Sequence, residues 1–264
     1  MKITALVENK SSCELTAVHG LSLYIETERH RLLFDLGPDD TLVKNAAKRG
    51  IDLGQVDTVV ISHGHFDHGG GLAAFLKVNQ GAKIYIQRRA FEKHFSKSMG
   101  FIKVPIGLDQ KLMEHPQVVL VGGDCRIDEE LLLFTTADTS KFHSAANDTL
   151  YDEKGPDTFG HEQNLVIFGE KNVLIMGCGH CGVVNILERA RAYAPHLCIG
   201  GYHLSIPVTK KTVPEAVLEG IAGELQQYDM DFYTCHCTGE DAYAYLARRV
   251  KRMKYLSCGE EICV

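Results

Sequence analysis

The amino-acid sequence predicts a mixed α/β fold in which two β-sheets pack face to face and helices cover their outer faces. In both halves of the 264-residue chain, short apolar segments of strand length alternate with segments of helical spacing. Apolar residues make up 45% of the chain, which is enough for a sizeable core. No linker, heptad repeat or low-complexity tract interrupts the sequence, so we expect residues 1–264 to form a single domain of two αβ halves.

The first half is predicted to begin with an antiparallel sheet. Alternating or wholly apolar runs predict strands at residues 2–8, 22–27, 31–36, 56–62, 83–87, 118–121 and 131–136. Helical spacing predicts helices at residues 39–49, 72–76 and 88–95. The first of these helices has clear ends, because acidic residues lead into it and Gly50 stops it. Residues 96–116 show no strong periodicity and are expected to form an insertion or a lid.

The second half repeats this alternation. Strands are predicted at residues 165–168, 173–176, 197–201 and 232–234, and helices at residues 182–194, 213–228 and 240–252. Between the halves, residues 137–163 are polar and rich in turn-forming residues. Because loops of this length in a compact domain are usually functional or mobile, we expect this segment, with Lys141, His143 and His161, to border the active site.

The segment His63-Gly64-His65-Phe66-Asp67-His68 predicts a metal site. Alternate residues of an extended segment share a face, so His63, His65 and Asp67 can point the same way, and a turn into the next helix lets His68 join them. Three imidazoles and a carboxylate suit zinc or a similar divalent ion. Four ligands on so short a segment cannot easily surround one tetrahedral ion, so two ions are expected, with His63 and His65 on one and Asp67 and His68 on the other.

The alternative for this segment is a solvated polar loop with histidines placed by chance. Histidine accounts for only 13 of the 264 residues, so a chance cluster of this density at a strand-to-helix turn is improbable. The residue types and their spacing therefore favour the metal site over the polar loop.

Three further histidines follow apolar strands. His180 and His236 are each succeeded by glycine and a helix, which makes them the best candidates for additional ligands, although each alone could be a hydrogen-bonded loop histidine. His203 ends a strand on the same expected rim, either as a proton donor, a substrate contact or an alternative ligand, or in a structural hydrogen bond. His19, between the first two strands, is expected to be structural rather than a ligand.

On these motifs the sequence resembles the metallo-β-lactamase superfamily, whose signature His-x-His-x-Asp-His also follows a hydrophobic strand. The other matching segments are Leu32-Leu33-Phe34-Asp35 with Gly37 behind it, Gly177-Cys178-Gly179-His180, Gly200-Gly201-Tyr202-His203 and Cys235-His236-Cys237-Thr238-Gly239. The later segments resemble one branch, the 7,8-dihydropterin-6-methyl-4-(β-D-ribofuranosyl)aminobenzene 5′-phosphate synthase-like proteins. The resemblance covers nearly the whole chain and implies the four-layer αββα sandwich of the metallo-β-lactamase fold.

The resemblance also implies a centre of two divalent metal ions, Zn²⁺ first and Mn²⁺ or Fe²⁺ as alternatives. Its implied ligands are His63, His65 and His180 on the first ion and Asp67, His68 and His236 on the second. Asp35 would orient a ligand histidine or the bridging water from behind the ligands. Asp67, His203 and Asp35 are therefore the residues expected to take part in catalysis.

The sequence departs from the hydrolytic majority of the superfamily at Cys178, where those enzymes usually place an aspartate that bridges the ions. The bridging ligand is therefore either absent or replaced by water or hydroxide. Cys178-x-x-Cys181 and Cys235-x-Cys237 also raise the alternative of a structural zinc site with four cysteine ligands. Cys-x-Cys is too short for the usual zinc knuckle, so we expect redox-sensitive thiols that line the site without binding metal.

The composition limits which binding partners and which cellular location are expected. The net charge of −6 gives no reason to expect nucleic acid or an anionic membrane as a partner, and no apolar run approaches membrane-spanning length. The N-terminus lacks the apolar region of a signal peptide, and nine cysteines in a chain with no export signal are expected to stay reduced, so a cytoplasmic protein is predicted. A phosphorylated small-molecule substrate would need the metals or local cations such as Arg88, Arg89 and Lys141.

Three functions remain open from the sequence. The first, implied by the resemblance, is a transferase that joins a dihydropterin to an aminobenzene ribosyl phosphate with release of a phosphate-type leaving group. The second is a metal-dependent hydrolase of a phosphoester, cyclic phosphodiester or lactone. The third is a non-catalytic metal-binding or redox-sensing protein. The complete cluster of histidines and aspartate favours an enzyme over the third function.

Overall fold

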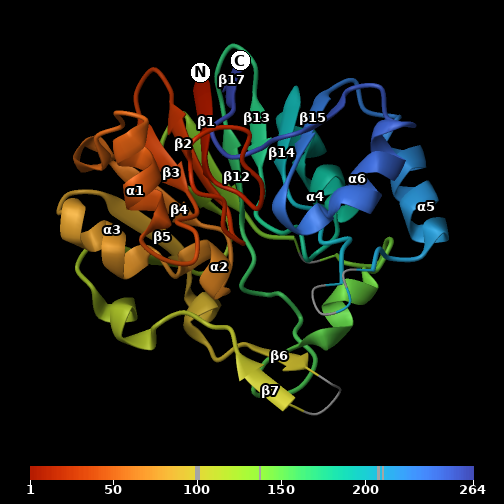
Figure 1. The fold of residues 1–264 in the computed structure, drawn as a ribbon, viewed down its shortest axis with the longest axis horizontal. Helices are drawn as coiled ribbons and strands as arrows, with labels where there is room; N and C mark the ends of the chain where they lie inside the picture. The colour runs from red at the N-terminus through yellow and green to blue at the C-terminus, as the bar shows by residue number, and fades with distance from the viewer. Residues whose placement is uncertain (99–101, 137, 207–208, 210) are drawn as a thin grey trace.

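The computed structural model describes all residues except 99–101, 137, 207–208 and 210. Two seven-stranded sheets stand side by side at the centre of the molecule, with helices on the outer face of each, so the predicted αββα sandwich is confirmed (Figure 1). The helices are α1 (Thr41–Lys48), α2 (Phe66–Gly69) and α3 (Leu72–Val78) beside the first sheet and α4 (Val183–Ala190), α5 (Glu215–Leu225) and α6 (Glu240–Ala247) beside the second. Among the residues described, no helix is long and apolar enough to cross a bilayer.

The first sheet has the order β17-β1-β2-β3-β4-β5-β8. Its strands are β1 (Lys2–Val7), β2 (Ser22–Glu26), β3 (Arg31–Phe34), β4 (Thr58–Ile61), β5 (Lys83–Gln87), β8 (Val118–Val121) and β17 (Glu261–Cys263). Pairing is antiparallel from β17 to β3 and parallel from β3 to β8. The carboxyl ends of β3 and β4 therefore meet at one edge of the sheet.

The second sheet has the order β16-β15-β14-β13-β12-β10-β9. Its strands are β9 (Cys125–Arg126), β10 (Leu131–Phe134), β12 (Asn164–Ile167), β13 (Val173–Ile175), β14 (Leu197–Gly200), β15 (Asp231–Thr234) and β16 (Met253–Tyr255). The strands from β13 to β16 are parallel, so the carboxyl ends of β13, β14 and β15 also share an edge. The two halves thus present equivalent edges to one another.

Apolar side chains fill the space between the sheets and the space under each helical layer. Between the sheets, Ile3, Phe34 and Val60 of the first sheet pack in one buried cluster with Leu165 and Ile175 of the second. These inward residues alternate with residues that face the helices, as the two-residue period of a strand requires. The sandwich therefore has one inner core and two outer ones.

A small third sheet lies below the two main sheets (Figure 1). It contains β6 (Phe95–Ser98), β7 (Ile102–Pro105) and β11 (Leu150–Tyr151). The helix predicted at 88–95 is therefore wrong: only a 3-10 turn, Arg88–Phe91, precedes β6. Pairing of β6 with β7 and β11 takes the place of the helical hydrogen bonds that propensity alone would favour.

Two other predictions differ from the structure near the C-terminus. Helix α6 ends at Ala247, earlier than expected, because the chain turns there and buries Val250. The strands β16 and β17 were not expected, and each is only three residues long. Strand β17 lies beside β1, and the amino group of Met1 donates to the carbonyl of Val264, so the two chain ends close the same edge of the first sheet.

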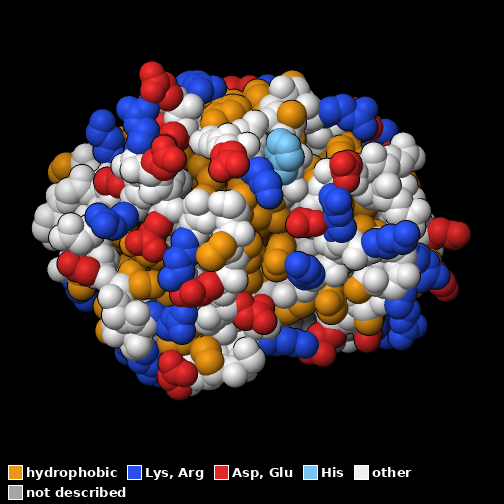
Figure 2. Space-filling model, turned by 90° about the horizontal axis from the view of Figure 1, so that it is seen from above, with side chains coloured by type: hydrophobic (Ala, Val, Ile, Leu, Met, Phe, Trp, Pro, Cys, Tyr) orange, Lys and Arg blue, Asp and Glu red, His pale blue; other side chains and the backbone are white. Residues whose placement is uncertain are grey.

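Charge is evenly mixed on the face that bears the chain ends. Figure 2 shows basic and acidic side chains interspersed there, with apolar side chains between them. A mixed surface of this kind has no strong field of one sign to attract a polyanion.

His30 joins the two sheets at the amino ends of their strands. Its Nδ1 lies 2.7 Å from Asp57 ahead of β4, and its Nε2 lies 2.7 Å from Asp128 ahead of β10. Burial disfavours the charged ring, but the hydrogen bonds with the two carboxylates outweigh burial and raise the pKa of His30. The protonated ring, donating to both carboxylates, therefore stabilises the fold.

We predict that His30→Gln lowers the free energy of unfolding by about 1–2 kcal/mol at pH 6, as expected for lost charge-assisted hydrogen bonds. Because the folded pKa is raised, this stabilisation is complete below the unfolded pKa and is lost as the pH rises through the folded pKa. Urea unfolding at pH 6 and pH 9 should show the difference from wild type shrinking at the higher pH. His196→Gln, at an exposed position, is the control, and an equal effect at both pH values would refute the role of His30.

Candidate metal centre

The candidate ligands gather where the carboxyl ends of strands from both sheets meet. The segment after β4 carries His63, His65, Asp67 and His68, the turn after β13 carries His180, and the turn after β15 carries His236. All six residues are buried. The structure thus brings together every ligand that the sequence predicted, from segments up to about 170 residues apart.

A tight backbone lets the first segment present four ligands. His65 has an extended conformation and Phe66 starts α2, so the chain turns between His65 and His68 as expected. Gly64 is pressed against the chain behind it: a Cβ there would lie 2.4 Å from the carbonyl oxygen of Ala90. Only glycine fits this approach, which fixes the path of the segment.

The first donor set consists of ring nitrogens of His63, His65 and His180. Nε2 of His63 lies 3.0 Å from Nδ1 of His65 and 3.3 Å from Nε2 of His180. Donor atoms about 2.0–2.1 Å from a tetrahedral zinc ion stand about 3.3 Å from one another. The spacing of these three nitrogens therefore fits one ion.

The second donor set consists of Asp67, His68 and His236. Nε2 of His68 lies 3.2 Å from Nε2 of His236. Oδ2 of Asp67 lies 3.3 Å from Nε2 of His236 and 3.8 Å from Nε2 of His68. Two of these separations match those of the first set and the third is wider, and the set adds one negative charge.

Asp35 fixes a ligand of each set from behind. Its Oδ2 accepts from Nδ1 of His68 at 2.7 Å and from the hydroxyl of Ser62 at 2.8 Å. The Ser62 oxygen, having donated its own proton, accepts from Nδ1 of His63 at 2.8 Å. Because both Nδ1 atoms are directed at these oxygens, the Nε2 atoms of His63 and His68 are turned toward the candidate centre.

Two asparagines do the same for the ligands of the second half. Oδ1 of Asn147 lies 2.9 Å from Nδ1 of His180, and its amide donates to the His180 carbonyl. Asn9 holds His236 in the same way, through Nδ1 at 2.9 Å and the His236 carbonyl. Both rings are therefore kept with Nε2 unprotonated and directed at the candidate centre.

Buried carboxylates anchor the turns that carry these ligands. Glu162 accepts from the backbone amides of His180 and Cys181, and burial raises the pKa of Glu162. Glu8 accepts from the amide of His236 and from the hydroxyl of Tyr255. These two residues and the asparagines could not be recognised from the sequence, because isolated polar residues at strand ends carry no motif.

Burial and crowding keep the first donor set neutral. Desolvation, together with neighbouring histidines, lowers the pKa values of His63 and His180 well below the ordinary value. For His68, burial opposes protonation, but the nearby carboxylates of Asp35 and Asp67 outweigh it and raise the pKa to about 9. The ring nitrogens of the first set are thus in the form that binds metal.

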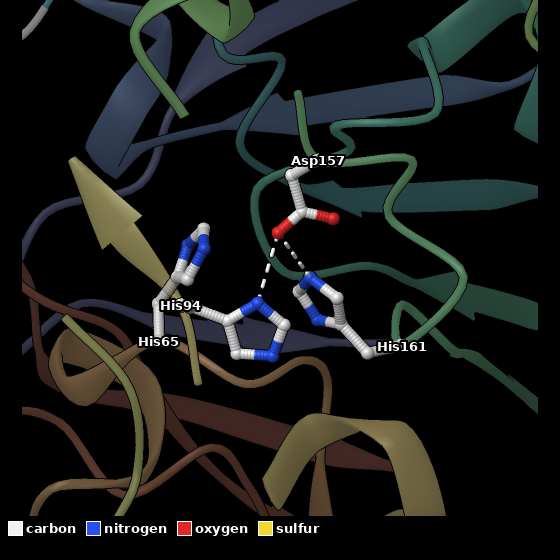
Figure 3. Close-up of side chains that lie close together, drawn as sticks. All are labelled: His65, His94, Asp157 and His161. Carbon is white, nitrogen blue, oxygen red and sulfur yellow. Dashed lines mark hydrogen bonds and ion pairs between the residues drawn. The ribbon is translucent and has the colours of Figure 1, made fainter. Parts of the chain in front are cut away.

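A hydrogen-bonded cluster of His94, Asp157 and His161 packs beside the ring of His65 (Figure 3), although Nε2 of His65 has no hydrogen-bond partner among the described residues. Asp157 contacts Nδ1 of His94 at 2.9 Å and Nε2 of His161 at 3.1 Å. Nδ1 of His161 accepts from the amide of Gly64, so its Nε2 carries the proton and offers no lone pair to an ion. We therefore interpret the cluster as a support for the metal-binding segment, and the predicted place of His161 beside the site agrees with this.

Three residues of the site have a left-handed backbone that is rare outside glycine. The φ angles are +61° at Asp35, +47° at His203 and +51° at His236. Such conformations cost free energy and persist where the surrounding structure holds them. Here the hydrogen bonds of Asp35 and His236 described above, and a bond from the Ser144 hydroxyl to the His203 carbonyl, hold them in place.

His203 and His19 lie at the entrance to the two donor sets. The ring of His203 is buried 4.2 Å from that of His180, and neither of its nitrogens has a hydrogen-bond partner among the residues described. The ring of His19 is half exposed, and its Nε2 lies 3.3 Å from Oδ2 of Asp67. His203 therefore has two free nitrogens for a bound molecule.

The four cysteines of the two short motifs lie in different environments. Cys178 and Cys237 line the pocket over the centre. Cys181 packs in the core under the second helical layer, and Cys235 packs between the sheets. A zinc site of four cysteines does not fit this arrangement.

A pocket of about 560 Å³ opens over the two donor sets. Its wall includes Phe66, Ile106, Leu150, His203 and Tyr255. This volume suits a small organic molecule. The expected insertion at 96–116 contributes to this wall through Ser96 and Ile106.

Arg88, Arg89 and Lys141, which the sequence suggested for substrate binding, lie outside this pocket. Arg88 is exposed, and Arg89 pairs with Glu92. Lys141 pairs with Glu188 and lines a neighbouring cavity of about 260 Å³, on the other side of His180. Among the described residues, Lys10 is the one Lys or Arg in the wall of the main pocket.

Comparison with known proteins finds a family profile, sequence relatives and a solved structure that resemble this chain. The profile of the metallo-beta-lactamase superfamily matches residues 15–187. The 7,8-dihydropterin-6-methyl-4-(beta-D-ribofuranosyl)-aminobenzene-5′-phosphate synthase of Methanocaldococcus jannaschii is 27% identical over 70% of this chain and 71% of its own. The uncharacterised protein MJ0448 of the same organism is 23% identical over 93% of this chain and 94% of its own. The crystal structure of Tm1679, described as a metal-dependent hydrolase of the beta-lactamase superfamily, is 27% identical, with a TM-score of 0.84 over 100% of this chain and 99% of its own.

We predict that Asp35→Asn weakens the affinity for both ions about 10–100-fold, because its carboxylate supports one ligand of each set. Asn147→Ala should weaken only the first ion, since Asn147 contacts only His180 among the ligands. Chelator titration followed by metal analysis distinguishes the two variants. Asp35→Asn should lose both of the expected ions together, and Asn147→Ala should lose one. Loss of a single ion from Asp35→Asn would contradict the shared support.

Proposed function

Because the chain belongs to the metallo-β-lactamase superfamily, we propose that it is a hydrolase that uses two divalent metal ions, Zn²⁺ ahead of Mn²⁺ or Fe²⁺. Its substrate class would be a phosphoester, cyclic phosphodiester or lactone. The observation that carries this proposal is the pair of three-atom donor sets at the floor of an open pocket, with donor separations of 3.0 and 3.3 Å in the first set and 3.2, 3.3 and 3.8 Å in the second. Such ions, when bound, lower the pKa of water and polarise the electrophile.

The residues of the chain would supply orientation and proton transfer. Asp35 holds His63 and His68 in the tautomer that binds metal. His203 faces the pocket with both ring nitrogens free, close to His180 of the first set. It can therefore donate a proton to the leaving oxygen of a substrate or hydrogen-bond to it.

The wall of the pocket indicates how a substrate would lie. Lys10, its one described cation, is already paired with Glu240 at 2.8 Å, and Asp241 adds a second acidic group. An anionic group of the substrate would therefore bind at the ions, and not at the rim. Phe66, exposed to 43%, and Ile106 offer apolar contact to the uncharged part of the molecule.

The second candidate is the condensation of a dihydropterin with an aminobenzene ribosyl phosphate. The 27% identity to the synthase of Methanocaldococcus jannaschii supports it, as do the rings of Phe66 and Tyr255 in the pocket, which can stack on a planar heterocycle. A purely metal-binding or redox-sensing role is less favoured, because it gives no reason for a pocket of about 560 Å³ with a histidine free to act on a ligand.

His65→Ala should reduce the metal content from two ions to one per chain and abolish activity, since it removes one of three donors of the first set. Plasma emission spectrometry of protein purified without chelator measures the content. The same sample is screened against phosphodiester, phosphomonoester and lactone substrates. His196→Ala, at an exposed histidine, is the matched control. Two ions retained in His65→Ala would remove it from the ligand set, and two ions in wild type with pterin condensation but no hydrolysis would select the second candidate.

His203→Ala should keep two ions and lower kcat about 10²–10⁴-fold, as expected for loss of a general acid. The test is steady-state kinetics on the best substrate of the screen, together with metal analysis. His203→Gln should not restore the rate if His203 donates a proton, because an amide side chain does not release a proton to a leaving oxygen. Full activity of His203→Ala would assign the ring a structural role.

A further inference from the structure

Exposed apolar side chains gather on the small third sheet, below the two main sheets and beside the pocket (Figure 1). Four large apolar side chains are exposed among the residues that the structure describes, each to between 43% and 46%: Phe66, Val78, Ile102 and Val104. Single exposed apolar residues are common, but a contiguous group of them marks a binding surface. Three of the four, all except Val78, belong to one such group.

The strand register places Ile102 and Val104 on the face of the third sheet that borders the pocket. Val104 of β7 pairs with Ser96 of β6, which in turn pairs with Leu150 of β11. Ser96, Leu150 and Ile106 all line the pocket. Paired residues share a face of a sheet, as do alternate residues along a strand, so Val104 and Ile102 continue the pocket wall outward.

The opposite face of the third sheet has a different character. Phe95 and Pro105, which pair with each other, line a separate cavity of about 380 Å³. The aromatic rings of that face lie under cations. Nζ of Lys97 is 3.6 Å from the centre of the Tyr151 ring, and Nζ of Lys103 is 5.3 Å from that of Phe95. Those rings are therefore already covered by side chains of the same sheet, whereas the aliphatic side chains on the pocket face of β7 are exposed.

Backbone hydrogen bonds attach β7 to the segment that carries the candidate ligands. The amide of Phe66 donates to the carbonyl of Ile106 at 2.8 Å, and the amide of Ile106 donates to the carbonyl of His94 at 2.9 Å. From Ile106 to Ile102 the chain extends about 13 Å, at about 3.3 Å per residue. We call the resulting line of apolar side chains, Phe66, Ile106, Val104 and Ile102, the apolar track.

Resting on the hydrolase function proposed above, we infer that the apolar track binds a linear apolar chain of the substrate while the reacting group lies over the two donor sets. The substrate class is then a lactone or phosphodiester that carries an alkyl or acyl chain. Continuity argues for this occupant, because Phe66 and Ile106 belong both to the pocket wall and to the track. A chain that leaves the pocket along β7 removes its own apolar surface and that of Ile102 and Val104 from water, which strengthens binding.

Binding of alkylphosphonates to the full-length protein loaded with zinc tests the inference. Methylphosphonate and decylphosphonate share an anionic head and differ only in the chain. By titration calorimetry, wild type should bind decylphosphonate about 10–100-fold more tightly than methylphosphonate, as expected for partial burial of the chain. The double variant Ile102→Thr/Val104→Thr retains β-branched side chains and strand propensity. It should lose most of this gain and bind methylphosphonate as wild type does.

Val78→Thr is the matched control, because Val78 is equally exposed but ends α3 and does not line the pocket. This variant should keep the full gain for decylphosphonate. Circular dichroism of each variant checks folding.

Hydrolysis gives a second readout on substrates with the same two chains. In the series that the protein hydrolyses, phosphodiester or lactone, the double variant should raise KM for the decyl compound and leave kcat unchanged. Both parameters should stay as in wild type for the methyl compound.

The outcomes separate this inference from the proposed function. Equal binding of the two phosphonates by wild type, or a gain that the double variant keeps, would overturn the apolar track and leave the hydrolase standing. A gain that depends on Ile102 and Val104, without hydrolysis of any tested substrate, would support the track and count against the hydrolase. Failure of both phosphonates to bind would overturn both. A wild-type dimer that dissociates in the double variant, measured by light scattering, would assign these side chains to an interface between two copies and also overturn the inference.

Discussion

The hydrogen bonds of Asp35 are the constraint on which the candidate centre depends. This carboxylate is fully buried, and a charge in that position is stable only when several donors surround it. Its donors are the amide and hydroxyl of Ser62 and the ring of His68. Because Ser62 in turn accepts from His63, one carboxylate at the end of β3 sets the orientation of a ligand in each donor set.

Buried carboxylates also position the candidate ligands in the second half of the chain. Glu8, directly after β1, holds the turn that carries His236, although the two residues are 228 positions apart. Glu162, ahead of β12, holds the turn that carries His180. The inner core between the sheets therefore determines how far apart the two donor sets lie, and the chain ends that close the edge of the first sheet are part of the same frame.

The sequence predicted those parts of the site that are local. His63, His65, Asp67 and His68 lie within six residues, and a strand followed by a turn is enough to bring them together. His180 and His236 were recognisable because each follows an apolar strand. Their placement on separate ions came from the family resemblance and stays a prediction; in the structure Nε2 of His180 lies 3.3 Å from Nε2 of His63, and Nε2 of His236 lies 3.3 Å from Oδ2 of Asp67.

Contacts between distant segments could not be predicted in this way. Asn9 and Asn147 are ordinary loop residues until the fold places them against His236 and His180. Residues 88–95 were wrongly expected to be helical, because local spacing does not reveal that β6 will pair with β7 and β11. Short edge strands such as β17 were not predicted for the same reason: their stability comes from the neighbouring strand and not from their own three residues.

The balance of charge links the centre to the molecule that it would bind. With Asp67 as the one carboxylate among its candidate ligands, the proposed two-ion centre would retain a net positive charge, to which His63 and His180 add none because burial keeps them neutral. The rim of the pocket has the opposite sign, with Glu240 and Asp241 beside Lys10. An anionic reacting group is therefore drawn to the floor of the pocket, while a second anionic group at the rim would be repelled. Under the proposed hydrolase function, this arrangement would favour a substrate with one anionic or polarisable centre and an uncharged remainder, such as a lactone or a cyclic phosphodiester, over a molecule with phosphates at both ends.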